Sequence, residues 1–175
     1  EKNINEIFTG VLCAQTDILK DGLLEIKDDN AAGEFYLTDI VSIMSNKGIK
    51  INTYVASNDE VKGANSHREL AELEGIFREM KAQDILDMGI TVSDPSRLDV
   101  RGEVSSGKDC SIDVNVILEG NVELGDNVSI GPNCVIKNTS IESNSKIDAF
   151  CHIDGAKVGE GCVVGPYARL REGSQ

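Results

Sequence analysis

The chain has 175 residues and a formal net charge of −13, with 40% hydrophobic and only 4% aromatic residues. This length is typical of one or two domains, and the negative charge argues against nucleic acid as a partner because it repels phosphate backbones. The sequence shows no apolar run long enough to predict a membrane span and no signal peptide, so we expect a cytoplasmic protein.

The first third of the chain predicts a segment with α/β character. Residues 7–15 (IFTGVLCAQ) and 49–56 (IKINTYVA) are typical of strands, whereas residues 16–26 and 34–46 are typical of short helices. Gly48 follows the second of these helices and is expected to end it. Because these elements are too few to close a doubly wound sheet, the segment is expected to be the last part of a larger domain.

A long helix is predicted from Ser66 to about Met88. Ser66 and Glu69 have the spacing of a capping box, and Gly89 is expected to end the helix. The apolar residues follow a narrow stripe with spacings of three and four residues. This stripe is typical either of a connecting arm that rests on a neighbour or of an oligomerisation coiled coil, and two heptads favour the arm.

Beyond this helix the aliphatic residues recur every six positions, shortened to five at two places. They are Ile112, Leu118, Leu124, Ile130, Ile136, Ile141, Ile147, Ile153, Val158, Val164 and Leu170. A fixed hexapeptide repeat is typical of a parallel β-helix, in which each repeat supplies one short strand and a corner. Three repeats per coil predict a three-sided prism in which Ile112, Ile130, Ile147 and Val164 stack on one face. An antiparallel sandwich is the weaker alternative, because eleven consecutive positions fit the repeat.

The residues between the aliphatic positions fit the same architecture. Small or slim side chains occur four residues after an aliphatic one, at Val116, Val122, Val128, Cys134, Ser145, Cys151, Cys162 and Ala168. Glycines directly follow an aliphatic residue at positions 125, 131, 159 and 165, and asparagines occur three residues after one at positions 115, 121, 127, 133 and 144. Both residue types tolerate a positive φ, so we expect them at the corners.

The five cysteines match no zinc-binding spacing; they are Cys13, Cys110, Cys134, Cys151 and Cys162. Cys134 and Cys151 fall at equivalent positions of neighbouring coils. They are either a disulfide or thiol pair, or two reduced cysteines that pack as small apolar side chains. The second interpretation is favoured for a cytosolic protein.

Eight stretches of the sequence resemble one enzyme family. They are residues 6–10 (EIFTG), 33–40 (GEFYLTDI), 60–65 (EVKGAN), 94–97 (DPSR), 99–102 (DVRG), 116–121 (VILEGN), 134–138 (CVIKN) and 165–171 (GPYARLR). In this order they resemble the bacterial bifunctional N-acetylglucosamine-1-phosphate uridyltransferase / glucosamine-1-phosphate N-acetyltransferase. The resemblance implies the C-terminal part of a nucleotidyltransferase domain at residues 1–65, a helical linker arm at 66–89 and the N-terminal part of a left-handed parallel β-helix at 90–175. On this interpretation the chain is a fragment of a longer protein.

The resemblance also implies two reactions for the longer protein. One transfers an acetyl group from acetyl-CoA to glucosamine 1-phosphate. The other joins UTP to N-acetylglucosamine 1-phosphate with the help of Mg²⁺, giving UDP-N-acetylglucosamine for peptidoglycan and lipopolysaccharide synthesis. The family forms homotrimers, and its catalytic residues match none in this chain, so the chain alone is expected to be inactive. His152 is expected to be an exposed polar residue beside a corner. The alternative function is a non-catalytic assembly or regulatory module of the same architecture.

Three positions correspond to substrate-binding residues of the family. Asn65 matches the asparagine that binds Mg²⁺ and UDP-N-acetylglucosamine, and its neutral oxygen suits this ion; by itself it also fits a turn before the helix. Arg171 matches the arginine that grips the phosphate of glucosamine 1-phosphate, with Glu172 in place of the family's proline. Phe8 replaces a sugar-contacting asparagine, and a phenyl ring cannot supply the hydrogen bonds of an amide.

Overall fold

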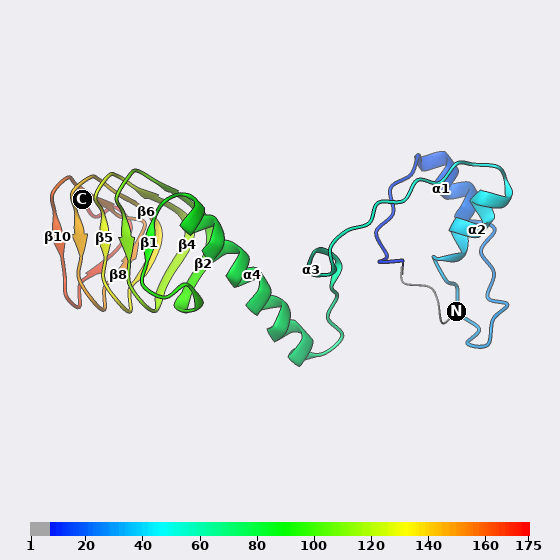
Figure 1. Ribbon diagram of the computed structural model, residues 1–175, viewed down its shortest axis with the longest axis horizontal. Coiled ribbons are helices and arrows are strands. Elements are labelled where there is room, and N and C mark those ends of the chain that lie inside the picture. Colours follow the sequence, from blue (N-terminus) through cyan, green and yellow to red (C-terminus); the bar gives the residue numbers. More distant parts are fainter. Residues whose placement is uncertain (1–7) are drawn as a thin grey trace. The chain divides into compact units, whose positions relative to one another are not determined.

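The structure is a computed structural model that describes residues 8–175. The chain forms two compact units, Glu1–Lys62 and Gly63–Gln175, each of which is described by itself. Figure 1 shows the elements of both units along the chain. None of the helices in the described residues combines the length and the apolar character that a membrane span requires.

The N-terminal unit contains helices and, among its described residues, no strand. The helices are α1 (Thr16–Leu23), α2 (Asp39–Asn46) and α3 (Asn58–Val61). The strands predicted at 7–15 and 49–56 are therefore wrong for every residue that the structure describes, residue 7 lying outside the described part. A strand is stabilised by hydrogen bonds to a neighbouring strand, and neither segment has such a neighbour within residues 8–62.

The two longer helices of this unit pack closely because α1 carries a glycine at their contact. Gly22 is buried, and a Cβ atom at this position would lie 2.6 Å from both Ile40 Cγ1 and Met44 Cε. Ile40 and Met44 are 3% and 6% exposed. The end of α2 agrees with the prediction, since Gly48 follows it with a φ of 76°. The described part of this unit thus has a small core confined to one helix pair.

The long helix α4 (His67–Asp87) confirms the predicted helix and most of its predicted cap. The backbone N–H of Glu69 donates to Ser66 Oγ at 3.2 Å. The reciprocal bond differs from the prediction, because the Glu69 carboxylate accepts from the backbone N–H of Asn65 at 2.6 Å instead of from Ser66. Gly89 follows the helix with a φ of 86°, as expected for a helix stop.

Only the C-terminal part of α4 packs on the following domain. Ala82 and Ile85 are each 2% exposed and belong to the same core cluster as the strands. Along the apolar stripe further toward the start of the helix, Leu70, Phe77 and Met80 are 47%, 55% and 55% exposed. Ala82 and Ile85 are therefore the buried part of the contact between arm and β-helix, while the predicted stripe stays largely uncovered.

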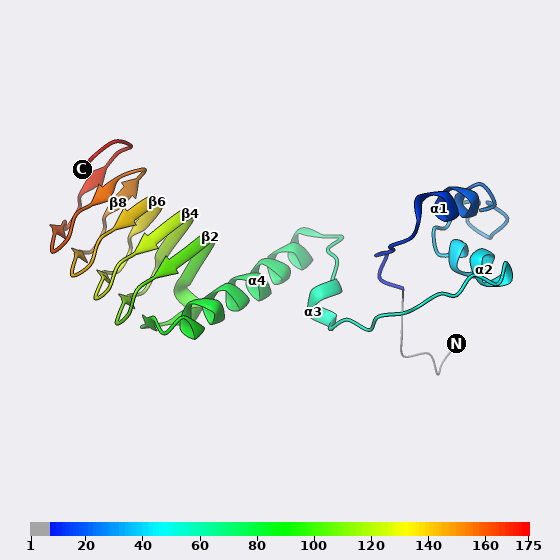
Figure 2. The same cartoon turned by 90° about the horizontal axis from the view of Figure 1, so that it is seen from above.

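The remaining residues form a parallel β-helix, which confirms the predicted fold (Figure 2). Its elements are β1 (Thr91–Val92), η1 (Pro95–Arg97), β2 (Leu98–Ser106), β3 (Ser111–Ile112), β4 (Val116–Leu124), β5 (Ser129–Ile130), β6 (Val135–Ile141), β7 (Lys146–Ile147), β8 (His152–Asp154), β9 (Lys157–Val158), β10 (Val163–Val164) and β11 (Arg169–Leu170). One sheet has the order β1-β3-β5-β7-β10 and the other β11-β8-β6-β4-β2, while β9 pairs with β6. Because β6 pairs with both β8 and β9, it contributes to two faces of the prism.

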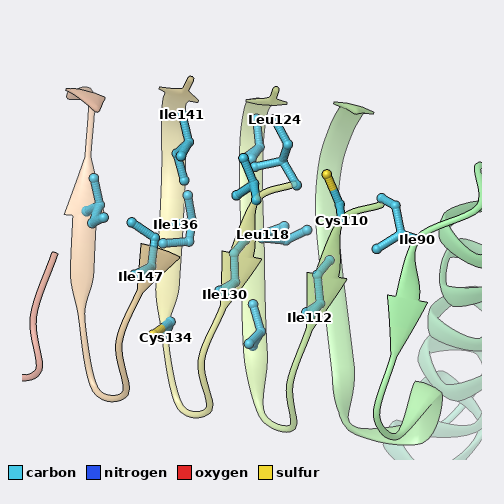
Figure 3. Packing of buried hydrophobic residues seen from close by; sticks show 14 of the residues in the cluster. Ile90, Cys110, Ile112, Leu118, Leu124, Ile130, Cys134, Ile136, Ile141 and Ile147 are labelled. Carbon is cyan, nitrogen blue, oxygen red and sulfur yellow. The ribbon is translucent and has the colours of Figure 1, made fainter. Parts of the chain in front are cut away.

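The aliphatic positions stack in three columns along the inside of the β-helix. The columns are Ile112–Ile130–Ile147–Val164, Leu118–Ile136–Ile153–Leu170 and Leu124–Ile141–Val158. All are at most 5% exposed except Val164 and Leu170, which are partly buried against the same core. Figure 3 shows part of this interior, to which all three columns contribute labelled side chains, among them Ile112, Leu118 and Leu124. The stacking predicted from the repeat is therefore confirmed.

The corners follow the prediction for asparagine better than for glycine. Positive φ values between 55° and 62° occur at four of the five asparagines, namely 115, 127, 133 and 144. Asn121 does not have one, because its neighbour Gly120 takes the corner with a φ of 67°. Of the four glycines expected at corners, only Gly165 has a positive φ. Gly125 instead permits close approach, since a Cβ there would lie 2.5 Å from the backbone N of Ser143.

Two aromatic residues continue one of these asparagine corners. Asn115 Nδ2 donates to Asn133 Oδ1 at 2.8 Å on consecutive coils. Phe150 and Tyr167 also have left-handed backbones, with φ values of 61° and 60°. Their rings stack with centroids 5.1 Å apart and an interplanar angle of 5°. Side-chain stacking at this corner thus changes from amide hydrogen bonds to ring contact.

Candidate functional site

Asn65 lies immediately before α4, in an exposed position. Its backbone N–H is bound by Glu69, so its main chain is part of the helix cap. Its amide side chain is exposed and could contact a ligand. The backbone of Asn65 thus serves the cap, as the interpretation of a turn before the helix expects, and its side chain is exposed.

Magnesium would need more ligands than Asn65 supplies. The ion prefers six oxygen ligands, of which one neutral amide oxygen is a single member. Within residues 8–175, no three or more His, Cys, Asp or Glu side chains gather in a way that could hold a metal ion. The nearby Glu69 carboxylate already accepts the N–H of Asn65. The described residues therefore do not fit a complete magnesium site by themselves.

Phe8 belongs to the N-terminal unit, and Asn65 and Arg171 belong to the other. Phe8 is 40% exposed. Within the second unit, Asn65 precedes the cap of α4, whereas Arg171 directly follows β11 in the last coil. Within this unit, Asn65 and Arg171 are therefore placed at different elements.

Arg171 lies on the outer surface of the sheet that contains β11. Leu170 pairs with Ile153 and points toward the core, so the next residue, Arg171, points outward. Arg169 precedes Leu170 and points outward as well, opposite His152 of β8. The last coil thus presents two guanidinium groups on one outer face. In a chain with a net charge of −13, this is the local positive charge that a phosphate needs.

Two further residues lie close to this face, and one of them differs from its prediction. Glu172 packs over Gly155 of the preceding coil, where a Cβ atom would lie 3.0 Å from Glu172 Cγ. Gly155 has a φ of 66° and no side chain, so Glu172 fills the space at that corner. His152 lies within β8 and is half-buried, whereas we expected it to be exposed beside a corner.

A column of alternating charges runs along the same outer face. In the strand register, Arg101 lies opposite Glu119, Glu119 opposite Lys137, and Lys137 opposite Asp154. The four residues belong to β2, β4, β6 and β8, which follow one another in Figure 2. The Lys137 ammonium contacts the Glu119 carboxylate at 2.9 Å. This hydrogen bond is the largest cause of a lowered pKa of Glu119 and of a raised pKa of Lys137. Sequence reasoning missed the column, although its members are 17 or 18 residues apart and alternate in sign.

The interior cysteines show no features of a reactive site. All five cysteines are free, and Cys134 and Cys151 are buried within the core. Burial raises the pKa of the Cys134 thiol, which keeps it protonated and poorly nucleophilic. The Cys134 thiol donates to the carbonyl oxygen of Asp148 at 3.1 Å. The favoured interpretation of reduced cysteines that pack as small side chains agrees with this arrangement.

The fold and the outer face together define a hexapeptide-repeat β-helix protein with a helical arm and a cationic patch on its last coil. A family model described as the GMPPB C-terminal domain matches residues 100–174, which lie inside the β-helix.

Similarity to curated proteins extends over almost the entire chain. The chain is 47% identical over 173 residues to the protein named Bifunctional protein GlmU of Idiomarina loihiensis, covering 98% of this chain and 38% of the relative. It is 50% identical over 172 residues to the protein of that name from Paraburkholderia xenovorans, with 98% and 38% coverage. The chain is also 50% identical over 175 residues to the protein of that name from Paraburkholderia phymatum, which covers 99% of this chain and 39% of the relative.

These matches confirm the resemblance predicted from the motifs. The chain, with its helical arm and β-helix, is similar to a segment of the proteins named Bifunctional protein GlmU. It spans about two fifths of the length of the curated relatives that it matches.

Proposed function

We propose that this chain is part of an enzyme that makes UDP-N-acetylglucosamine in two reactions. The proposal rests on the sequence identity of 47–50%, across nearly the whole chain, to proteins named bifunctional. It rests also on Arg169 and Arg171, which lie on one outer face of the last coil. The first reaction transfers acetyl from acetyl-CoA to the amine of glucosamine 1-phosphate. The second transfers uridylyl from UTP to N-acetylglucosamine 1-phosphate and releases pyrophosphate.

On the acetyl-transfer side, the role of this chain is to bind the sugar phosphate. The Arg171 guanidinium offers a planar set of N–H donors that matches two phosphate oxygens, and its charge does not titrate near neutral pH. Arg169 adds a second positive charge on the same outer face. These groups would hold the phosphate and so orient the amine toward the acetyl donor. The residues that move protons in this reaction would lie elsewhere in the full-length protein.

On the uridylyl-transfer side, Asn65 would contribute one neutral oxygen to Mg²⁺ and a contact to the product. Because one amide oxygen is a small part of a Mg²⁺ shell, further ligands would have to come from the rest of the full-length protein; an ion held there would supply positive charge to the phosphates. Phe8 changes the sugar contact, because a ring offers an apolar face where the family has an amide. We therefore expect the sugar to be held by stacking at this position, with weaker discrimination of its polar groups.

We further propose that the full-length protein is a cytoplasmic homotrimer, as the family resemblance implies. Light scattering of the purified full-length protein measures the number of subunits directly. A mass of three subunits supports the proposal, and a monomeric mass at assay concentrations contradicts it.

Activity assays on the full-length protein test the proposed function. Acetyl transfer is followed by release of free CoA, and uridylyl transfer is followed by release of pyrophosphate. We expect both products from the full-length protein and neither from the 175-residue chain alone. Full-length protein that makes neither product supports the alternative of a non-catalytic assembly module, and turnover by the isolated chain refutes the assignment of catalysis to residues elsewhere.

A further inference from the structure

Arg171 has a fixed neighbour in the outer column of alternating charges. Because Leu170 pairs with Ile153, the following residues, Arg171 and Asp154, lie beside each other on adjacent strands. Adjacent strands are about 4.8 Å apart, which is within reach of an aspartate and an arginine side chain. Gly173 continues the pairing of these two coils, since its N–H donates to the carbonyl oxygen of Gly155 at 3.1 Å. The backbone thus holds the two residues side by side.

The column continues in sign as well as in position. Its members read Arg101, Glu119, Lys137 and Asp154, so a cation at the next position continues the alternation. Asp154 already acts along the column, because its charge contributes to the raised pKa of Lys137. Arg171 takes the place after Asp154 and is exposed. The carboxylate of Asp154 therefore has a cation on each side.

Neither of the other charged residues beside Arg171 lies opposite it in the strand register. Arg169 lies on the same face and repels it, and Glu172 packs over Gly155 at the corner. Ser174 Oγ accepts the backbone N–H of Arg171 at 3.3 Å and leaves its guanidinium free. Asp154 is thus the carboxylate that the strand register places next to the guanidinium.

We propose that Asp154 is a positioning residue that holds the Arg171 guanidinium for the phosphate of the sugar substrate. The inference rests on the proposed function, because it assigns a second residue to the same site. One edge of a guanidinium can bind a carboxylate while another binds a phosphate. No ion pair joins the two side chains in the described structure, and contacts of this kind often tighten only when the substrate is bound. Asp154 would then cost the phosphate some repulsion but fix the direction of its main cationic ligand.

Kinetics of the full-length protein carrying Asp154→Asn test this inference. We expect the KM for glucosamine 1-phosphate to rise about threefold to fivefold, the upper range for an exposed ion pair, with kcat changed less than twofold. The KM for acetyl-CoA and the uridylyl-transfer activity should stay the same. Asp154→Glu keeps the carboxylate and should restore most of the KM. An unchanged KM, or a lower one from reduced repulsion of the phosphate, overturns the inference.

The matched control is Glu119→Gln, which removes a carboxylate of the same column two strands away. Glu119 has an ion pair with Lys137, so its loss reports any general effect of weakening the column. We expect this variant to leave the KM for the sugar phosphate unchanged. An equal rise of KM in Glu119→Gln and Asp154→Asn shows a merely structural role and overturns the inference.

Arg171→Ala separates this inference from the proposed function. If Arg171→Ala leaves the KM unchanged, the phosphate site itself is wrong. If Arg171→Ala raises the KM and Asp154→Asn adds nothing further in that background, the coupling through Arg171 is confirmed. An independent, additive effect of Asp154→Asn in the Arg171→Ala protein overturns the positioning role while leaving the phosphate site in place.

Discussion

The β-helix and the N-terminal unit differ in how their apolar residues are used. In the β-helix, the aliphatic columns give one continuous core whose members are almost all below 6% exposure. In the N-terminal unit, Leu24, Phe35, Tyr54 and Val55 are 85%, 69%, 88% and 71% exposed. Each coil of the β-helix buries its neighbours through the same register, so the fold is stabilised locally along its axis. The N-terminal segment has no repeated partner of this kind within residues 8–62.

This contrast shows that regular spacing, and not apolar content alone, lets a segment of this chain bury its own apolar residues. The aliphatic residues of the β-helix each meet a similar residue one coil away. The apolar residues of the other unit alternate as in a strand, but no pairing strand in the described chain uses that alternation.

We expect the largest loss of stability when a buried side chain of the β-helix is shortened. Ile136 is 0% exposed, and Ile136→Ala removes a side chain that both neighbouring coils contact. We expect a loss of about 2–5 kcal/mol in the free energy of unfolding, measured by urea denaturation followed by circular dichroism. The control is Tyr54→Ala at an 88% exposed position, for which we expect a change below about 0.5 kcal/mol. Similar losses for both variants would remove the proposed difference between the regions.

A smaller effect is expected where the N-terminal unit does have a core. Gly22→Ala places a Cβ 2.6 Å from Ile40 and Met44. Overpacking of this kind costs about 1–3 kcal/mol, which exceeds the gain in helix propensity of up to about 1 kcal/mol. We expect faster amide hydrogen exchange in α1 and α2, with exchange in the β-helix unchanged. Slower exchange in the two helices would show that their contact is not close-packed.

Gly75→Ala is the matched glycine substitution on the arm, with the opposite sign. A Cβ at Gly75 would meet no heavy atom within 4 Å, and the residue lies inside α4. Alanine should therefore stabilise α4 by about 0.5–1 kcal/mol through its helix propensity. Protection of the α4 amides from hydrogen exchange measures the gain. Destabilisation instead would mean that this face of the arm is covered in solution.

The smallest effect concerns alkaline pH. The pKa of Cys134 is raised by burial, so the folded state holds its proton more tightly than the unfolded state does. Its contribution to stability is complete below the unfolded thiol pKa of about 8.5 and is lost as the pH rises through the higher folded value. We expect unfolding free energies to fall between pH 8 and pH 10, as measured by urea denaturation.

Cys134→Val is the control for this pH dependence, because valine occupies the equivalent position 116 in the preceding coil. We expect this variant to show a shallower decrease with pH. An identical decrease in both proteins would assign the effect to other groups.

The sequence alone predicted the β-helix well because its signal is periodic. The eleven aliphatic positions gave the columns, and Ser66 and Glu69 gave the start of α4. The strands at 7–15 and 49–56 were wrong because alternation shows what a strand could bury, and not whether a partner strand is present. Asn121 was misplaced because β4 and β6 change register between Glu119 and Val122.

The candidate site was predictable only in part. Arg171 and Asn65 came from family resemblance, since neither has a distinctive local pattern. Arg169 and Asp154 became candidates only through the pairing of β8 with β11, which places residues from different coils on one face. Such a relation depends on coil length, and two coils here are shortened by one residue. The strand register therefore shows which residues of different coils lie side by side, and the spacing along the chain does not.

The most direct test of the account is the separation of two activities in the full-length protein by two substitutions. Arg171→Ala should reduce acetyl transfer to glucosamine 1-phosphate at least tenfold and leave uridylyl transfer intact, because a charged hydrogen bond to phosphate is lost. Asn65→Ala should do the reverse. If both variants keep both activities, or if each loses both, the assignment of these residues to two separate substrate sites is contradicted.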